Sequence, residues 1–343
     1  MNLDGYALPI EKLKGTEPVE SLDLSGKKLR VASASAIVIA SLISVNGSLT
    51  SLDLSNNVLC GMTPYGDTYT AEGITAIADA LRVNGALTSV SLTGNKLGDE
   101  GWGAIIAAIC GNKNSKIMSM DASDESIGPA GVKLIAEALR TSVTGGLTEL
   151  SIYGNHVGDE GVRAICEAIQ SSKATKLTSL NFGYNGIGPV GANAVAAMVA
   201  VTGALTVTNL LKNQLDADSA MMLAEFAKQK GVSLCGIRRD QTTADFSKQS
   251  FKPPDVILLA SDLSQDIVTG SLTVTNLLRN ELDAESAKML AEVAKQKGIS
   301  LCGIQRDQTT AVFYRQGLEP PDAILLASDL SQAGVTGGLT KIE

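Results

Sequence analysis

The sequence predicts an α/β solenoid, a curved horseshoe with short parallel strands on its concave face and helices on its convex face. Three observations lead to this prediction. A template recurs along nearly the whole chain at a spacing of about 30 residues. Each copy places apolar residues two apart before an Asn, and an apolar stripe with helical spacing follows. One such unit cannot cover its own apolar side, so stacked neighbours must bury it.

Residues 87–101 (LTSVSLTGNKLGDEG) show the template clearly. Val90 and Leu92 stand two apart, so they point to the same face of a short strand. Asn95 follows where the chain turns away, and its amide offers donors and an acceptor to backbone groups that a buried turn leaves unpaired. A helix begins a few residues later, and Asp99 is suited to cap it.

The template allows every repeat to be placed by its first apolar residue. The starts are Val19, Leu49, Leu87, Ile117, Leu147, Leu177, Leu205, Leu234, Leu272, Leu301 and Leu339. We predict that the recurring Asn forms a structural ladder along the solenoid. Its members are Asn57, Asn95, Asn155, Asn185, Asn213 and Asn280. Two repeats depart from it, with Lys27 in the first, as a terminal capping repeat would show, and Glu125 in the fourth.

The domain organisation follows from the same starts. Residues 1–18 form a lead-in, and residues 19–343 form a single domain of about ten repeats plus the start of another. Long variant repeats occupy residues 49–86, 234–271 and 301–338. The first carries an insertion at 60–73 that is rich in Gly, Pro and Tyr and predicts an ordered loop. The other two are near-copies, because residues 205–269 reappear at 272–336.

The C-terminal repeat is incomplete, since residues 339–343 supply only its opening strand. An uncovered strand edge invites pairing with another chain. We therefore expect this edge to be covered by further chain or by another subunit.

Composition excludes several classes of function. The net charge of −8, without clusters of Lys or Arg, argues against nucleic acid as a partner. The five cysteines are scattered and odd in number, which predicts free thiols in the cytoplasm or another reducing intracellular compartment. No secretion signal opens the chain, so the sequon at Asn46 is interpreted as a turn. The longest apolar run, 34–45, is too short for membrane insertion.

The chain lacks residue sets for catalysis, cofactors or metals. His156 is the single histidine, and a Ser-His-Asp or Cys-His set has no second candidate for its base. Acidic pairs such as Asp99 and Glu100 recur at expected helix starts, where negative charge suits the helix dipole. We predict that the protein is not an enzyme, and we assign no catalytic, cofactor-binding or metal-ligating residue.

The repeats resemble the ribonuclease-inhibitor-like subfamily of leucine-rich repeat proteins. The resemblance rests on the motif LxxLxLxxNxLG-[DP]-x-G followed by an amphipathic helix. This motif occurs at 87–109, 147–169 and 177–199. The chain is also similar to the repeat region of NOD-like receptors, but it holds no GxxxxGK[ST] for their nucleotide-binding module. The resemblance covers about 19–343 and implies protein binding through the concave face.

A candidate binding patch lies on adjacent strands of that face. Tyrosines flanked by acids are typical of protein-binding centres. The candidate residues are Asp121, Asp124, Glu149, Tyr153 and Tyr184. A solvated inner face without any binding centre is the alternative.

Further along, the face should turn apolar through Leu211 and Leu278 and basic through Lys212 and Arg279. The whole pattern favours a non-catalytic scaffold or adaptor that binds a protein, and the acids would select a basic one. One alternative is a peripheral subunit of a large assembly, docked through its ends and insertions. Another, implied by the resemblance, is an enzyme inhibitor of the ribonuclease-inhibitor type.

Overall fold

A computed structural model describes residues 2–3, 5–30, 35–60 and 69–343. It divides into two compact units. Unit 1 comprises residues 1–187 and 201–205, and unit 2 comprises residues 188–200 and 206–343. The organisation of residues 19–343 as a single domain stays a prediction. The loop expected at 60–73 lies largely outside the described residues.

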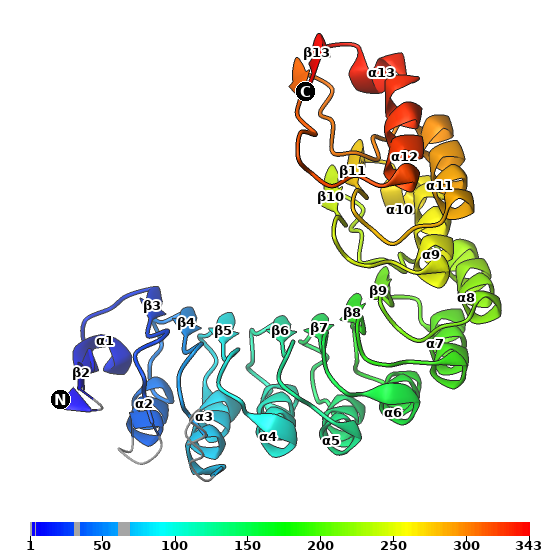
Figure 1. Cartoon of the computed structure of the whole chain (residues 1–343). Helices are drawn as coiled ribbons and strands as arrows, with labels where there is room; N and C mark the ends of the chain where they lie inside the picture. The colour runs from blue at the N-terminus through cyan, green and yellow to red at the C-terminus, as the bar shows by residue number, and fades with distance from the viewer. Residues whose placement is uncertain (1, 4, 31–34, 61–68) are drawn as a thin grey trace. The chain divides into compact units, whose positions relative to one another are not determined.

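Unit 1 opens with a small folded lead-in. Strands β1 (Asn2–Leu3) and β2 (Tyr6–Ala7) pair antiparallel, and helix α1 (Ile10–Lys14) follows. The parallel strands after it are β3 (Ser21–Asp23), β4 (Ser51–Asp53), β5 (Ser89–Ser91), β6 (Ser119–Asp121), β7 (Glu149–Ser151) and β8 (Ser179–Asn181). The helices are α2 (Ser35–Ile43), α3 (Glu72–Val83), α4 (Gly98–Gly111), α5 (Pro129–Arg140) and α6 (Gly158–Ser171). Within unit 1, strands follow one side and helices the other (Figure 1).

The core of unit 1 is built of stacked apolar layers, as the template predicts. The central strand residues stack in register, with Met120 beside Leu150 and Leu150 beside Leu180. The predicted helical stripes also point inward, and Val132 and Ile135 on α5 are fully buried. Because each layer touches only its neighbours, the fold is stabilised repeat by repeat.

The Asn side chains sit in the turns that follow the strands. Asn155 donates from Nδ2 to the carbonyls of Ala122 (2.8 Å) and Ile152 (2.9 Å), which belong to the preceding repeat and to its own turn. Its Oδ1 accepts from the N–H of Ile127 at 2.9 Å. Equivalent bonds to a carbonyl in the same turn are made by Asn57, Asn95, Asn185, Asn213 and Asn280.

Removing the amide of Asn155 should therefore leave buried backbone groups unpaired. We expect Asn155→Ala to lower the free energy of unfolding by about 1–3 kcal/mol, the usual cost of such groups. Chemical denaturation followed by circular dichroism measures it. A denaturation curve identical to that of the parent protein would contradict the structural role of the ladder.

Glu125 completes the ladder where the Asn is missing. Its carboxylate accepts from the N–H of Gly94 at 2.6 Å and from the N–H of Leu97 at 3.3 Å, so it bonds back to the preceding repeat. Asp99 behaves differently from the expectation. It does not cap its own helix, whose N-cap is Leu97 without a side-chain bond, and it accepts instead from the N–H of Gly128 at 2.7 Å. Asp99 lies inside the first turn of α4, so its side chain reaches the next repeat rather than the N-terminal N–H groups of α4.

A second set of buried asparagines joins the loops at the other end of the helices. Asn84 donates to the carbonyls of Ile43 (2.8 Å) and Asn46 (3.1 Å), and it accepts from the N–H of Leu87 (2.8 Å). Asn112 makes matching bonds to the repeat before it, and Asn46 makes them to helix α1 of the lead-in. The sequon residue Asn46 is thus a buried structural amide, which agrees with its interpretation as a turn.

Unit 2 contains the duplicated segment. Its strands are β9 (Val207–Asn209), β10 (Thr243–Asp245), β11 (Val274–Asn276), β12 (Thr310–Ala311) and β13 (Lys341–Ile342). The long helices are α7 (Pro189–Val201), α8 (Ala217–Lys230), α9 (Pro253–Ser264), α11 (Ala284–Lys297) and α12 (Pro320–Leu330). Two short helices, α10 (Asp266–Thr269) and α13 (Ala333–Thr336), follow α9 and α12. Strand β10 pairs in parallel with β11, and β12 with β13.

The repeat starts at Leu234 and Leu301 do not lead into strands as the template predicts. The chain forms only an isolated bridge at Ser233, and the strand proper comes later as β10. A buried carboxylate explains the difference. Asp262 on α9 accepts from the N–H of Leu234 and of Cys235, both at 2.9 Å, and from the Ser233 hydroxyl at 2.7 Å. The carboxylate thereby takes the donors that a strand would offer. Asp329 repeats this arrangement in the second copy.

The buried carboxylate also predicts a pH dependence. Burial raises the pKa of Asp262 from 3.8 to about 6, although its hydrogen bonds favour the charged form. The folded state then holds the proton more tightly than the unfolded chain, so this contribution to stability is full below 3.8 and is lost as the pH rises through about 6. We expect Asp262→Asn to remove that slope. The difference in unfolding free energy between parent and variant, followed across this pH range, measures it, and a constant difference would contradict the shift.

Candidate functional site

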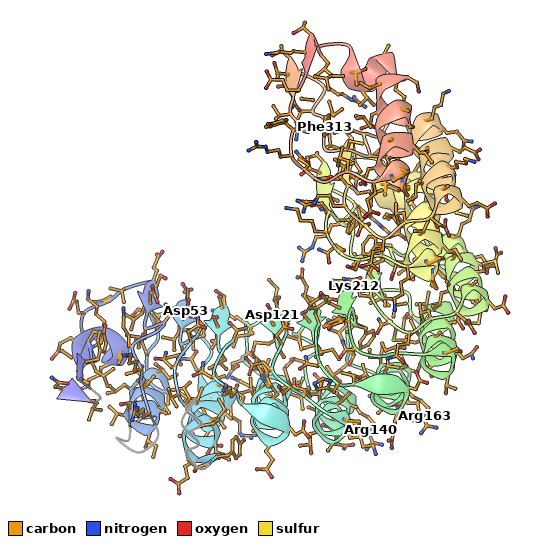
Figure 2. All side chains as sticks on the ribbon, in the orientation of Figure 1. Asp53, Asp121, Arg140, Arg163, Lys212 and Phe313 are labelled. Carbon is orange, nitrogen blue, oxygen red and sulfur yellow. The ribbon has the colours of Figure 1, made fainter. Side chains whose placement is uncertain are left out.

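The candidate site lies on the strand face of unit 1. This surface carries the side chains at the first, third, fifth and sixth positions, counted from the first residue of each strand. In Figure 2, Asp53 and Asp121 lie on this side of unit 1, whereas Arg140 and Arg163 lie on the helix side. Because parallel strands lie about 4.8 Å apart, residues at equal positions form rows of close neighbours.

Two tyrosines form the centre of the site. Tyr153 follows β7 at the fifth position and Tyr184 follows β8 at the sixth, and their ring centroids lie 6.1 Å apart at an interplanar angle of 33°. Tyr153 is half-buried and packs over Gly183, where a Cβ would stand 2.9 Å from a ring atom. Tyr184 is 58% exposed. The pair therefore presents one supported ring and one accessible ring.

Three carboxylates accompany the tyrosines on and just after the neighbouring strands β6 and β7. Asp124 follows β6, and a Cβ on Gly154 would lie 2.0 Å from its Oδ1, so this carboxylate covers the backbone next to Tyr153. Asp121 ends β6 and is exposed, and Glu149 opens β7 and is half-buried. The structure thus places all five predicted residues on three neighbouring strands. A role for them in binding stays a prediction.

The aspartates at the third position share a fixed orientation. The Oδ1 atoms of Asp53 and Asp121 accept from the N–H two residues on, at 2.8 and 3.0 Å. In the first repeat, hydrogen bonds from the hydroxyl and N–H of Ser25 lower the pKa of Asp23. Local turns therefore fix the orientation of these carboxylates before any ligand arrives.

One expectation for the strand face is wrong. Leu211 and Leu278 do not make it apolar, since they are only 5% and 3% exposed. The cause is the extra segment in each copy of the duplication. It passes over the strand, so that a Cβ on Gly303 would lie 3.4 Å from the Cβ of Asn276. Nothing in the template signals that cover. The basic residues Lys212 and Arg279 remain half-buried and exposed, respectively.

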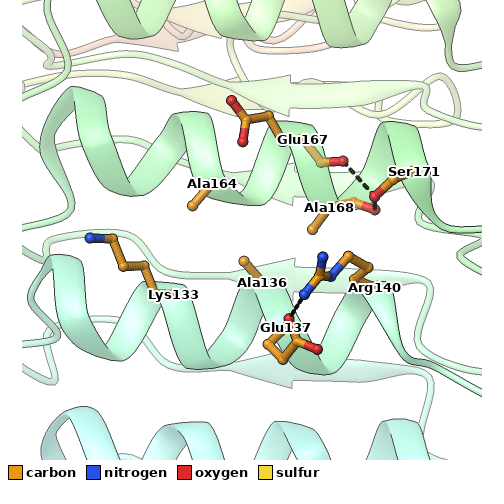
Figure 3. A pocket seen from close by; sticks show the side chains of 8 residues that line it. All are labelled: Lys133, Ala136, Glu137, Arg140, Ala164, Glu167, Ala168 and Ser171. Carbon is orange, nitrogen blue, oxygen red and sulfur yellow. Dashed lines mark hydrogen bonds and ion pairs between the residues drawn. The ribbon is translucent and has the colours of Figure 1, made fainter.

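The helix side of unit 1 holds a furrow of about 370 Å³ between α5 and α6. Alanines form its floor, and Figure 3 shows charged side chains along its rim. Arg140 pairs with Glu137, and Lys133 pairs with Glu160 at 2.6 Å, so the rim charges satisfy one another. The furrow therefore has no polar groups converging on a ligand.

The five cysteine thiols and the single histidine are further candidate reactive groups. All five cysteines are free and buried, and burial raises the pKa of Cys60 to about 12 and of Cys110 to about 11, which disfavours reactive thiolates. His156 is exposed. Within the described residues, no group of three or more His, Cys, Asp or Glu is placed to hold a metal ion. No described helix is both long and apolar enough to cross a bilayer.

Solved structures with related architecture were found at low similarity. The leucine-rich repeat-containing protein LegL7 from Legionella pneumophila is 18% identical, with 95% of each chain covered and a TM-score of 0.48. Leiomodin-1 actin-binding site 2 covers 56% of this chain and 86% of its own, at 18% identity and a TM-score of 0.30. The tropomodulin C-terminal domain of Caenorhabditis elegans covers 48% and 92%, at 18% identity and a TM-score of 0.31. None of the curated proteins compared with the chain matches it.

Family models give the decisive comparison. A model described as Leucine Rich repeat matches residues 86–105, 147–166 and 173–196. A second model of the same description matches residues 48–66. The matches of the first model each span a strand, the Asn turn and a helix start described above. The ribonuclease-inhibitor-like subfamily stays a prediction. On these matches and on its repeating geometry, the chain is a leucine-rich repeat protein.

Proposed function

We propose that the protein is a non-catalytic scaffold or adaptor that binds a basic segment of a partner protein on the strand face of unit 1. The tyrosine patch, defined as Tyr153, Tyr184, Asp121, Asp124 and Glu149, forms the centre of that surface. Leucine-rich repeat domains are generally protein-interaction modules, and this patch is where the chain offers aromatic area together with charge.

The conformation of Tyr184 is the observation that carries the proposal. Its φ is +54°, in the left-handed region, where a side chain costs roughly 1–2 kcal/mol. At the same position the other repeats of unit 1 have only Gly, Asn or Asp, the residue types that adopt this region most readily: Gly26, Asn56, Gly94, Asp124 and Gly154. A large exposed ring at a strained position is more costly than the fold requires, and strained residues cluster at functional sites.

The surrounding charges define the partner. Carboxylates in complementary positions steer a basic partner and speed its encounter more than they tighten the complex. Rigid rings supply the contact area at low entropic cost. We therefore expect Asp121→Asn to slow association and to reduce its dependence on salt, while Tyr153→Ala weakens the complex by about 2 kcal/mol or more.

Differential capture tests the proposal in the native source. Parent protein, Tyr153→Ala, Tyr153→Phe and the helix-side control Lys133→Ala are immobilised, and bound proteins are quantified by mass spectrometry. A partner should be retained by the parent, by Tyr153→Phe and by the control, and it should be lost from Tyr153→Ala. Equal capture by all four proteins would place the interface elsewhere.

Tyr184→Asn separates a binding role from a packing role. Relief of about 1 kcal/mol of backbone strain should offset the lost ring contact, which is worth about 0.5–1.5 kcal/mol. We expect the free energy of unfolding to stay close to that of the parent while capture of the partner falls. Lower stability with unchanged capture would show that the ring only packs against Tyr153.

A further inference from the structure

Unit 2 carries a row of cations at the same strained backbone position. Lys212, Lys248, Arg279 and Arg315 stand at the sixth position after β9, β10, β11 and β12, with φ between +55° and +64°. Glycine and asparagine fill this position at little cost, whereas long side chains do so at a loss of stability. Strands β10 and β11 are paired in register, so Lys248 and Arg279 are direct neighbours. The duplication repeats Lys212 and Lys248 as Arg279 and Arg315, so both copies keep a positive charge at these positions.

The two copies of the duplicated segment differ on this same surface. Asp245 and Ser247 in the first copy correspond to Val312 and Tyr314 in the second, while the cation that follows is kept. Val312 is 51% exposed and Tyr314 is 67% exposed, and the guanidinium of Arg315 lies 5.0 Å from the Tyr314 ring centroid. The second copy has thus gained exposed apolar and aromatic groups beside its cations.

A small cavity adjoins these groups. It has a volume of about 160 Å³ and is lined by Val312, Phe313, Gln316 and the covering segment at Gly303 and Ile304, among others. Figure 2 shows both Phe313 and Lys212 on the strand side of unit 2. We call this surface the cationic patch, made of Lys212, Lys248, Arg279, Arg315, Val312 and Tyr314. It combines an apolar centre, a hollow and a positive rim.

The tyrosine patch of unit 1 has the complementary character. It holds two rings together with Asp121, Asp124 and Glu149, so each patch combines aromatic area with charge, and the two charges are opposite. Nucleic acid is a poor occupant for the cationic patch, because the chain carries a net charge of −8 and would repel phosphates. An acidic protein surface with rings at its centre suits it better.

We propose that the cationic patch of one molecule binds the tyrosine patch of a second copy of this chain. The inference rests on the proposed function, since it names the partner of the tyrosine patch. Electrostatic attraction brings the patches together, and the rings of both surfaces and the cavity beside Phe313 supply the apolar contact. The contact joins different surfaces of the two copies, so it closes only if it is made reciprocally or around a ring.

A charge exchange tests the contact. The acid-reversed variant carries Asp121→Lys and Asp124→Lys, and the base-reversed variant carries Arg279→Glu and Arg315→Glu. Sedimentation equilibrium of the full chain should show association in the parent protein. Each reversed variant alone should associate at least about tenfold more weakly, because like charges then face each other. Mixed in equal amounts, the two variants should associate with each other, since every charge pair is again opposite.

Salt and a matched control complete the experiment. Raising the salt concentration from about 50 to about 300 mM should weaken the parent association about tenfold, as the Debye length contracts. The control Lys113→Glu with Lys116→Glu makes the same charge change as base reversal on two exposed residues beyond α4, and its association should stay close to that of the parent. Thermal unfolding should show that each variant is folded.

Three outcomes would overturn the inference. They are a monomer under all conditions, an association that neither reversal weakens, and a mixture of the reversed variants that stays monomeric. Capture that still depends on Tyr153 in a protein that stays monomeric would leave the proposed function standing and reject the second copy as partner. Self-association that follows the charge exchange but ignores Tyr153→Ala would confirm the pairing and reject the ring as its centre.

Discussion

Asp262→Ala is expected to lower the free energy of unfolding by about 3–5 kcal/mol, the cost of breaking a buried charged network from one side. The carboxylate is fully buried, and it takes donors from Ser233, Leu234 and Cys235. Alanine would leave the N–H of Leu234 and the hydroxyl hydrogen of Ser233 without acceptors in the core, and the N–H of Cys235 with only a 3.3 Å bond to the Ser233 hydroxyl. Since α9 would then lose its hold on the preceding segment, residues 233–235 should become the weakest part of unit 2.

Denaturant titration of Asp262→Ala against Asp266→Ala provides the measurement. Asp266 lies one turn further along, and its exposed carboxylate pairs with Lys297 at 2.7 Å. Surface pairs of this kind contribute about 0–1 kcal/mol, so the control should remain close to the parent. Equal losses for the two variants would show that the buried carboxylate has no special role.

Gly145→Ala is the second change with a large expected effect. Gly145 has a φ of +61°, and a Cβ would stand 1.6 Å from the carbonyl oxygen of Ala174 in the next repeat. Alanine would carry both the penalty of a left-handed residue and a clash with backbone, which has no rotamer to escape into. We expect a loss of about 2–5 kcal/mol, the sum of the two usual penalties.

The chain provides its own control for this position. Gly203 precedes Leu205 just as Gly145 precedes Leu147, but no described heavy atom beyond its chain neighbours lies within 4 Å of a Cβ placed there. Gly203→Ala should therefore be neutral within about 0.5 kcal/mol. Thermal unfolding of both variants measures the contrast. A Gly145→Ala protein as stable as Gly203→Ala would mean that the loops between repeats shift freely.

The sequence predicts the fold of each repeat because its determinants are local. The spacing of Val90 and Leu92 gives a strand, and Asn95 gives the turn. The isolated bridge at Ser233, just before the repeat start at Leu234, could not be predicted in this way. Its apolar pattern matches the template, yet the donors of that segment are taken by Asp262, which lies 28 residues later in sequence.

The strand face was predictable only where nothing covers it. Tyr153 and Tyr184 were placed from register alone, since equal positions on parallel strands are neighbours. Leu278 fits the same rule but is buried under a segment whose path the sequence does not reveal. The second set of asparagines was visible, in contrast. Asn46 and Asn84 both stand three residues before a repeat start, but from the sequence only Asn46 is interpreted, as a turn.

The duplicated block gives the gene a way to change the length of the protein. Residues 206–211 and 273–278 have the identical sequence TVTNLL. Leu205 could therefore be followed by either segment without altering the strand that comes next. Unequal recombination between the two gene segments would then delete or add one block and keep the order of strands and helices. Each added block would bring another pair of cations with it, so copy number would adjust the strength of the charged row in whole steps.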